Sequence, residues 1–184
     1  YIVPGAVSDV EKVAFTGSEI ITDVTVTLNK VVLNEGVDYD IVFSSNTNVG
    51  TASYTVTGKG NYFGSVTKTF EITAVDIASI DNVTIDPQVF TASQIAPAVK
   101  PVFGEYNLTE NDFDVEYGEN LNVGTGSVTI KGKGNFTGTA KVEFDIVAKD
   151  ISEGITALIP GTTPGAQPEG VVLNYGEVVL ENGV

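Results

Sequence analysis

The chain has 184 residues and a formal net charge of −15, from 24 acidic residues against nine lysines, and it contains no arginine, histidine or cysteine. Nucleic-acid binding needs a basic surface facing the phosphates, so this balance argues against nucleic-acid partners, and it also disfavours anionic membrane surfaces. The lack of histidine and cysteine excludes histidine-bound metals, Ser-His-Asp triads, thiol nucleophiles and disulfides.

The first part of the chain has the alternating pattern of half-buried strands. Ala52, Tyr54 and Val56 alternate with threonine and serine, which is the period-two pattern of a sheet with one buried face. Threonine, valine, isoleucine and aromatic residues suit such a surface. In chain order, strands are expected at about 12–16, 20–28, 31–33, 37–44, 51–57 and 65–73.

The next part repeats the first at a shift of 74 residues. Residues 38–77 and 112–151 are identical at 19 of 40 aligned positions, which indicates tandem units. The second copy predicts strands at about 82–90, 95–103, 112–117, 125–131 and 139–147. We therefore predict all-β, antiparallel sandwiches, with a closed OB-type barrel as the alternative. The expected domains are 1–75, 76–149 and 150–184, with a short connection between the first two.

Both copies contain Gly-Lys-Gly-Asn between two strands, at 58–61 and 132–135. Glycine and asparagine adopt positive φ angles most easily, so the segment predicts a strand-to-strand turn. A glycine-rich loop with lysine can also bind phosphate, but the P-loop continues into a helix, and here a strand follows. We interpret the segment as structural.

The last part of the chain has a different composition. Residues 159–170 carry three prolines and three glycines, which predict an extended loop. Residues 171–184 align with 24–37 at a shift of 147, so they are expected to begin a third unit with unpaired strand edges. We predict that 171–184 pairs with a sheet edge of the second unit or of another molecule. Because no signal peptide, membrane-spanning run or methionine is present, a longer parent polypeptide is expected.

The ordered patterns of 36–72 resemble an immunoglobulin-like repeat of bacterial surface proteins. That family has an Asp-Tyr strand, an Asn-x-Gly-Thr-Ala turn, a Val/Thr strand, Gly-x-Gly-Asn-Tyr and a closing Phe-x-Ile strand, and here the set occurs twice. The second copy departs from it at Gly126, Phe113 and Phe136, which keep the packing role. The resemblance covers nearly the whole chain and implies tandem antiparallel immunoglobulin-like β-sandwiches. It also implies a secreted or cell-surface location, neighbouring repeats as partners, and no catalytic or cofactor-binding residues.

Carboxylates and lysines are the groups that remain for chemistry. A glycosidase needs two carboxylates facing one cleft, and the pairs Asp38/Asp40 and Asp112/Asp114 each share one strand face. That face is opposite the aromatic one, so we expect exposed strand charges there. The sequence thus predicts no catalytic residue and no enzyme activity.

Calcium is the one cofactor that the acidic residues bring into question. Carboxylate oxygens near the expected junctions could bind it and stiffen the array. Their spacing matches no EF-hand loop, so we predict no cofactor and keep these residues as candidates. The candidate metal ligands are Asp76, Asp81 and Asp150, with Asp86 and Glu153 nearby.

Four aromatic residues have no clear place in the core: Tyr62, Phe63, Tyr106 and Phe136. Exposed rings would form a platform for carbohydrate. Tyr62 and Phe136 occupy equivalent turn positions, however, so we expect them to pack over the end of the sandwich. Lys68 falls at an inward-facing position, and its stem is expected to snorkel past the sheet edge.

Duplicated modules supply length or multivalency, whereas chemistry needs one singular site. The expected function is a non-enzymatic structural spacer or stalk of an extracellular bacterial surface protein such as an adhesin. The alternatives are an adhesion module that binds host glycan or protein, and an accessory domain of a secreted polysaccharide-degrading enzyme.

Overall fold

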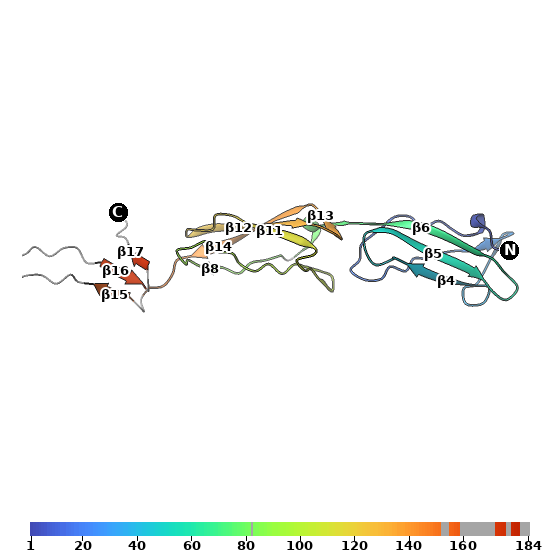
Figure 1. Ribbon diagram of the computed structural model, residues 1–184, viewed down its shortest axis with the longest axis horizontal. Coiled ribbons are helices and arrows are strands. Elements are labelled where there is room, and N and C mark those ends of the chain that lie inside the picture. Colours follow the sequence, from blue (N-terminus) through green and yellow to red (C-terminus); the bar gives the residue numbers. More distant parts are fainter. Residues whose placement is uncertain (82, 152–154, 159–171, 176–177, 181–184) are drawn as a thin grey trace, which may run out of the picture. The chain divides into compact units, whose positions relative to one another are not determined.

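The computed structural model describes residues 1–81, 83–151, 155–158, 172–175 and 178–180. The protein is all-β, as predicted, and its helical elements there are the short 3-10 turns η1 (Pro4–Ala6) and η2 (Ile77–Ser79) (Figure 1).

The chain divides into two compact units. Unit 1 comprises Tyr1–Thr84, Val99–Glu116 and Val128–Val142, and unit 2 comprises Ile85–Ala98, Tyr117–Ser127 and Glu143–Val184. The domain boundaries expected from the sequence, at 75/76 and 149/150, stay a prediction.

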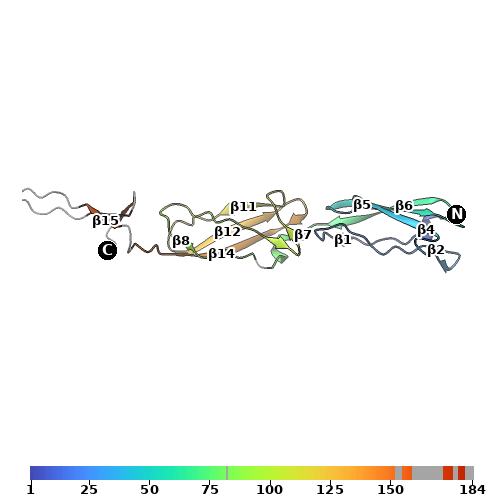
Figure 2. The same cartoon turned by 90° about the horizontal axis from the view of Figure 1, so that it is seen from below.

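A four-stranded sheet forms the frame of the first part of unit 1 (Figures 1 and 2). Its order is β1 (Val13–Ala14), β6 (Ser65–Thr73), β5 (Gly50–Gly58) and β4 (Tyr39–Ser44). The three long strands are antiparallel neighbours, and the predicted Gly-Lys-Gly-Asn turn joins β5 to β6. β1 pairs with β6 in parallel, so the prediction of wholly antiparallel sheets is wrong. Parallel neighbours need a long connection, which the residues between β1 and β6 supply.

The alternating residues of β5 divide the two faces of this sheet as predicted. Ala52, Tyr54 and Val56 are fully buried in one hydrophobic core of unit 1. On the other face Thr55 and Thr67 pair across the strands through their hydroxyls, 2.9 Å apart, a favourable cross-strand pair. The sheet therefore has one apolar face and one hydroxyl-rich face.

Several predicted strands are shorter than expected. The segment 20–28 contributes β2 (Thr27–Leu28), which pairs with β3 (Val31–Val32), 82–90 contributes β8 (Gln88–Val89), and 95–103 contributes β9 (Val102–Phe103). The apolar pattern of 20–26 does report burial, since Ile20 and Val26 are buried. The backbone of this segment forms isolated hydrogen bonds, such as the one from Leu33 N–H to the Val26 carbonyl at 2.9 Å. Alternation thus predicted which residues face the core, but not a continuous ladder.

A second sheet has the order β11 (Phe113–Tyr117), β12 (Gly124–Gly132), β14 (Thr139–Val147) and β8. β12 buries alternate residues in the same order as β5, and β8 pairs in parallel with β14 as β1 does with β6. Gly126 lies where β5 has Ala52, and a Cβ there would be 2.6 Å from Cζ of Phe144. The glycine leaves room for this buried ring.

Two short pairs and a third sheet complete the described elements. β9 pairs antiparallel with β10 (Tyr106–Asn107), and β7 (Val75–Asp76) pairs in parallel with β13 (Phe136–Thr137). β15 (Ile155–Leu158), β16 (Val172–Tyr175) and β17 (Val178–Leu180) form an antiparallel sheet.

The described part of the segment 171–184 therefore pairs with 155–158, where no strand was predicted. Pairing of this segment with another sheet edge stays a prediction. The extended loop predicted at 159–170 lies outside the described residues.

Candidate functional site

An aromatic cluster within unit 1 is built from Phe15, Phe103, Tyr106 and Phe136. The Phe15 ring meets the Tyr106 and Phe136 rings edge-on, with ring centroids 5.5 Å apart in both pairs. Phe103 and Phe136 are 5.8 Å apart in a similar edge-on contact. Such pairs contribute about 0.5–1.5 kcal/mol beyond area burial. Phe15 comes from residues 1–75 and the other three from 76–149, so both segments contribute to one apolar core.

Local backbone pairing positions these rings. The register of β9 and β10 sets Phe103 directly opposite Tyr106. Phe15 continues β1, because its N–H donates to the Thr73 carbonyl at 2.9 Å. Phe136 begins β13, whose register sets it opposite Val75. The cluster is thus fixed by strand ends that are far apart in sequence.

Polar contacts around Asn135 lie beside this cluster. Its side-chain Nδ2 donates to Oδ1 of Asn48 at 2.9 Å, and its Oδ1 accepts from Val49 N–H at 2.9 Å. Its backbone carbonyl accepts from Val75 N–H at 3.1 Å. We call Asn48, Val49 and Asn135 the asparagine clamp. The aromatic cluster and the asparagine clamp together are named the joint.

Tyr106 is also tied to the buried carboxylate of Asp112. Its hydroxyl donates to the two carboxylate oxygens at 3.2 and 3.3 Å, and Oδ2 also accepts from Thr109 N–H and Oγ1, both at 2.9 Å. Burial and the adjacent Asp112 carboxylate raise the pKa of Tyr106. The expectation that Asp112 is an exposed strand charge is wrong, since it is 4% exposed. It precedes β11 and closes a turn, so strand parity does not apply to it.

The other carboxylates of the two expected pairs have structural partners. Asp38 Oδ2 accepts from Asn34 N–H at 2.9 Å, much as Asp112 caps its own turn. Asp40 forms an ion pair with Lys59 at 2.8 Å, and Asp114 forms one with Lys133 at 2.5 Å. Exposed pairs of this kind stabilise a fold by at most about 1 kcal/mol. The two lysines belong to the Gly-Lys-Gly-Asn turns, which are anchored in this way to β4 and to β11.

The calcium candidates are dispersed. Asp76 caps η2, since its Oδ1 accepts from Ala78 N–H at 3.0 Å, while Asp81, Asp86 and Asp150 are exposed. Glu153 lies outside the described residues. Within the part of the chain that the structure describes, no three acidic side chains form a metal-binding group. Calcium binding stays a prediction.

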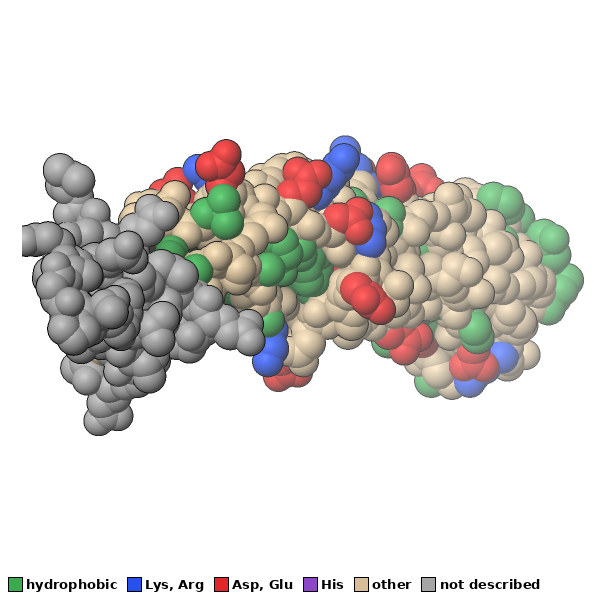
Figure 3. Space-filling model, turned by 60° about the vertical axis from the view of Figure 1, so that its left-hand side comes forward, with side chains coloured by type: hydrophobic (Ala, Val, Ile, Leu, Met, Phe, Trp, Pro, Cys, Tyr) green, Lys and Arg blue, Asp and Glu red, His purple; other side chains and the backbone are tan. Residues whose placement is uncertain are grey.

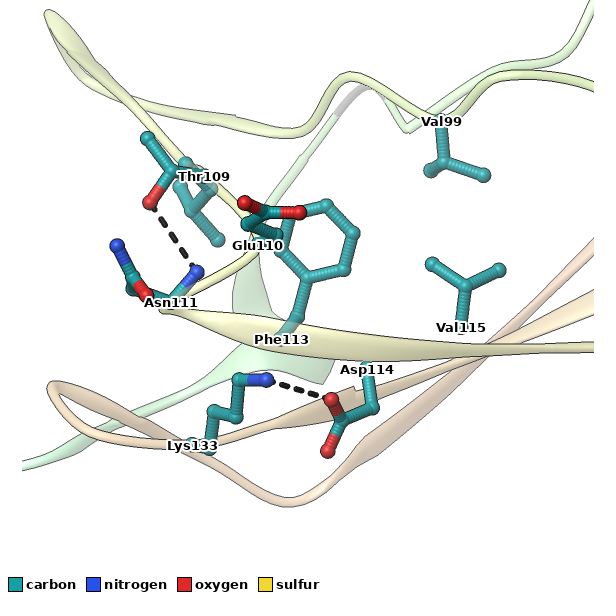
Figure 4. A pocket seen from close by; sticks show the side chains of 9 residues that line it. Val99, Thr109, Glu110, Asn111, Phe113, Asp114, Val115 and Lys133 are labelled. Atoms are coloured by element: carbon teal, nitrogen blue, oxygen red, sulfur yellow. Dashed lines mark hydrogen bonds and ion pairs between the residues drawn. The ribbon is translucent and has the colours of Figure 1, made fainter.

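A depression of about 650 Å³ in unit 1 is lined by Val99, Leu108, Thr109, Glu110, Asn111, Phe113, Asp114, Val115 and Lys133 (Figure 4). Val99 and Val115 face each other across it, and Asp114 points to the other side of β11 from Phe113. Its hydroxyl, amide and carboxyl groups could bind a hydroxyl-rich ligand. The Phe113 ring is buried, so it offers no face for stacking on a sugar.

The uncertain aromatic residues and Lys68 have different surroundings. Phe136 packs as expected in the joint, and Tyr62 is half-buried against the core of unit 1. Phe63 is 67% exposed, and its ring centroid lies 5.4 Å from that of Tyr1. Lys68 does not simply snorkel: its Nζ donates to the Val7 carbonyl at 2.6 Å and pairs with Asp9 at 2.6 Å. The ammonium is therefore bound by the N-terminal segment.

Two buried asparagines were missed by the sequence interpretation. Asn46 Nδ2 donates to the Ile20 carbonyl at 2.7 Å, and Asn120 Nδ2 donates to the Ile95 carbonyl at 3.0 Å. Each fixes an extended segment to the loop before the long central strand. The available signal was their identity at the 74-residue shift.

No protein-family model matches the chain, and the comparison with curated proteins finds no match. In the part of the chain that the structure describes, no helix has the length and apolar character needed to cross a membrane.

Proposed function

We propose that this chain is a non-enzymatic spacer of tandem immunoglobulin-like β-sandwiches from an extracellular bacterial surface protein. The observation that carries the proposal is the joint, which connects residues 1–75 to 76–149 through buried rings and amide hydrogen bonds. A joint with both kinds of contact opposes hinge motion, because bending exposes apolar rings and leaves amide groups unpaired. A repeated module with such joints can hold another domain at a distance from the cell.

The charge distribution supports a solvated spacer. Acidic side chains are set apart from one another over the face shown in Figure 3, and the net charge is −15. Net charge far from zero keeps a protein soluble and limits contact between copies. This pattern is typical of a solvated surface.

The test is a distance measurement across the joint. The chain has no cysteine, so the exposed residues Thr69 and Thr139 can be replaced by cysteine and spin-labelled. Pulsed electron paramagnetic resonance should give one narrow distance distribution. A broad distribution in the unaltered joint would contradict the spacer proposal.

Matched variants identify the contacts responsible. Phe15→Ala and Asn135→Ala should broaden the distance distribution, because they remove an aromatic and an amide contact of the joint. Asn61→Ala, the equivalent change in the other Gly-Lys-Gly-Asn turn, should leave it unchanged. Equal effects of all three would indicate that general stability, and not the joint, sets the distribution.

The second candidate function is adhesion to host glycan or protein, favoured by the polar lining of the depression in Figure 4. Glycan-array and mucin binding by the whole chain tests it, with Glu110→Ala and Asn111→Ala as variants of the lining. Binding that these variants abolish would favour adhesion over a pure spacer. A role as accessory domain would instead require a polysaccharide-degrading domain in the same open reading frame.

A further inference from the structure

Both halves of the joint have counterparts elsewhere in the chain. One half, the socket, consists of Phe103, Tyr106, Asn135 and Phe136, and the other half, the plug, consists of Phe15, Asn48 and Val49. Unit 1 contains a second socket, in which Leu28 and Val31 are the innermost pair of β2–β3, as Phe103 and Tyr106 are of β9–β10. Asn61 and Tyr62 complete it and lie 74 residues before Asn135 and Phe136. Unit 2 contains a second plug: Phe90, Asn122 and Val123.

The second socket repeats the strand register and the glycine-turn hydrogen bonds of the first. The β2–β3 register sets Leu28 opposite Val31, just as β9–β10 sets Phe103 opposite Tyr106. Both Gly-Lys-Gly-Asn turns make the same backbone bonds. These are Gly58 N to Gly64 O at 2.9 Å with Tyr62 N to Lys59 O at 3.1 Å, and Gly132 N to Gly138 O at 3.0 Å with Phe136 N to Lys133 O at 3.1 Å.

The second plug likewise repeats the first. Phe90 N–H donates to the Val147 carbonyl at 2.9 Å, as Phe15 N–H does to Thr73. The loops that hold the plug asparagines are fixed by equivalent bonds, from Ile20 N to Asn46 O at 2.8 Å and from Ile95 N to Asn120 O at 3.1 Å. The two loops that precede Asn48–Val49 and Asn122–Val123 therefore share this attachment point, although the positive φ angle lies at Ser45 in the first and at Asn120 in the second.

The second socket and the second plug each include a side chain that is open to solvent. Val31 is 58% exposed and Val123 is 57% exposed. Phe90 is half-buried, whereas its counterpart Phe15 is 2% exposed inside the joint. Among the residues that the structure describes, the side chains of Asn61 and Asn122 have no hydrogen-bond partner. Each surface thus lacks the contacts that its counterpart makes in the joint.

We propose that the second plug of one molecule binds the second socket of another copy of this chain. This inference rests on the proposed function, since it extends the joint from within one chain to between chains. Asn61 would bond to Asn122 and to Val123 N–H, as Asn135 does to Asn48 and Val49. Phe90 would enter between Leu28, Val31 and Tyr62. The occupant is a copy of this chain because this chain itself carries the matching socket.

The contact joins two different surfaces, so it can add copies in succession or close a ring. The second socket has aliphatic side chains where the first has Phe103 and Tyr106, so its contact is smaller than the internal joint. Copies with a net charge of −15 also repel one another, and salt screens that repulsion. Association should therefore increase with both protein concentration and ionic strength.

Mixing of two single-surface variants tests the proposal. Val31→Asp inactivates the second socket and leaves the plug intact, whereas Val123→Asp inactivates the second plug and leaves the socket intact. An aspartate carboxylate buried at either surface should weaken association about tenfold or more. Val42→Asp is the control, because Val42 is also exposed, at 66%, but lies outside both surfaces. Circular dichroism and thermal unfolding verify that all variants fold.

Sedimentation velocity on the full chain gives the result. The unaltered chain and Val42→Asp should associate beyond dimers or close into rings, each single variant should be monomeric, and the equimolar mixture of the two should give dimers. The inference is overturned if the unaltered chain stays monomeric at high concentration and high salt. It is also overturned if the mixture of the two variants forms no dimer. A narrow spin-label distance across the joint, found together with no association, would leave the spacer proposal standing and remove only this one.

Discussion

The side chain of Asn120 pairs with the backbone of Ser127 as a neighbouring strand would. Its Oδ1 accepts from Ser127 N–H at 2.8 Å, and its Nδ2 donates to the Ser127 carbonyl at 3.1 Å. The same Nδ2 also donates to Ile95. One buried amide thus joins the loop before β12, the strand itself and the extended segment around Ile95.

Asn120→Ala should therefore destabilise the protein strongly. The change leaves the Ser127 backbone and the Ile95 carbonyl without this partner, at a cost of about 2 kcal/mol or more. Denaturant unfolding measures the loss. Asn122→Ala, two residues away at an exposed position, is the control and should change the free energy of unfolding by less than about 0.5 kcal/mol. Equal losses in both variants would contradict the role given to the Asn120 amide.

Phe15→Ala should cost about 3–5 kcal/mol, the usual range for a buried phenylalanine, because Phe15 is 2% exposed and touches three other rings. Phe63→Ala removes the same side chain from a site that is 67% exposed and should cost under about 1 kcal/mol. Thermal unfolding of the two variants in parallel makes the comparison. Similar losses would mean that the aromatic cluster contributes no more than an exposed ring.

Alkaline pH should destabilise the fold through its buried tyrosines. Burial raises the pKa of Tyr39, Tyr54 and Tyr106 above the ordinary value of 10.0. The folded state then holds these protons more tightly than the unfolded state. Their contribution to stability is complete below pH 10.0 and is lost as the pH rises through the higher folded-state pKa values.

Tyr106→Phe isolates one of these contributions. The variant should lose about 1 kcal/mol at neutral pH, because Asp112 loses a donor, and its stability should fall less steeply above pH 10.0. Unfolding curves across this pH range, with a phenolate absorbance titration of both proteins, provide the measurement. An unchanged alkaline slope would show that Tyr106 titrates normally in the folded protein.

Gly138→Ala should destabilise the fold by about 1–3 kcal/mol, as is usual for a strained backbone position. Gly138 has a φ of +75°, and a Cβ there would collide with the Asp76 carboxylate. Gly5→Ala is the control, because nothing lies within 4 Å of the added Cβ. Differential scanning calorimetry should separate the two, and a Gly138 variant as stable as the control would refute the steric argument.

The sequence predicted the long strands well and the joint poorly. The bounds of β6 and β14 agree with the predicted 65–73 and 139–147. These strands were predictable because the alternation of buried and exposed residues is a property of a single strand. The contact of Phe15 with Phe136 depends on how distant strand ends meet, which no local pattern records. Asp112 was placed wrongly for a related reason, since its partners Thr109 and Tyr106 belong to the preceding turn and strand. Only the identity of Asn46 and Asn120 at the repeat shift could have indicated the buried amides.

The parallel pairing of β1 with β6 has a mechanical consequence. In a parallel pair, the start of one strand and the end of the other lie at opposite ends of the pair. A force that pulls on the chain before β1 and after β6 therefore acts along the strands, and their hydrogen bonds, such as Phe15 N–H to the Thr73 carbonyl, must yield together. β8 and β14 repeat this arrangement. Tension on a tethered chain would thus shear each strand pair as a whole rather than unzip it bond by bond.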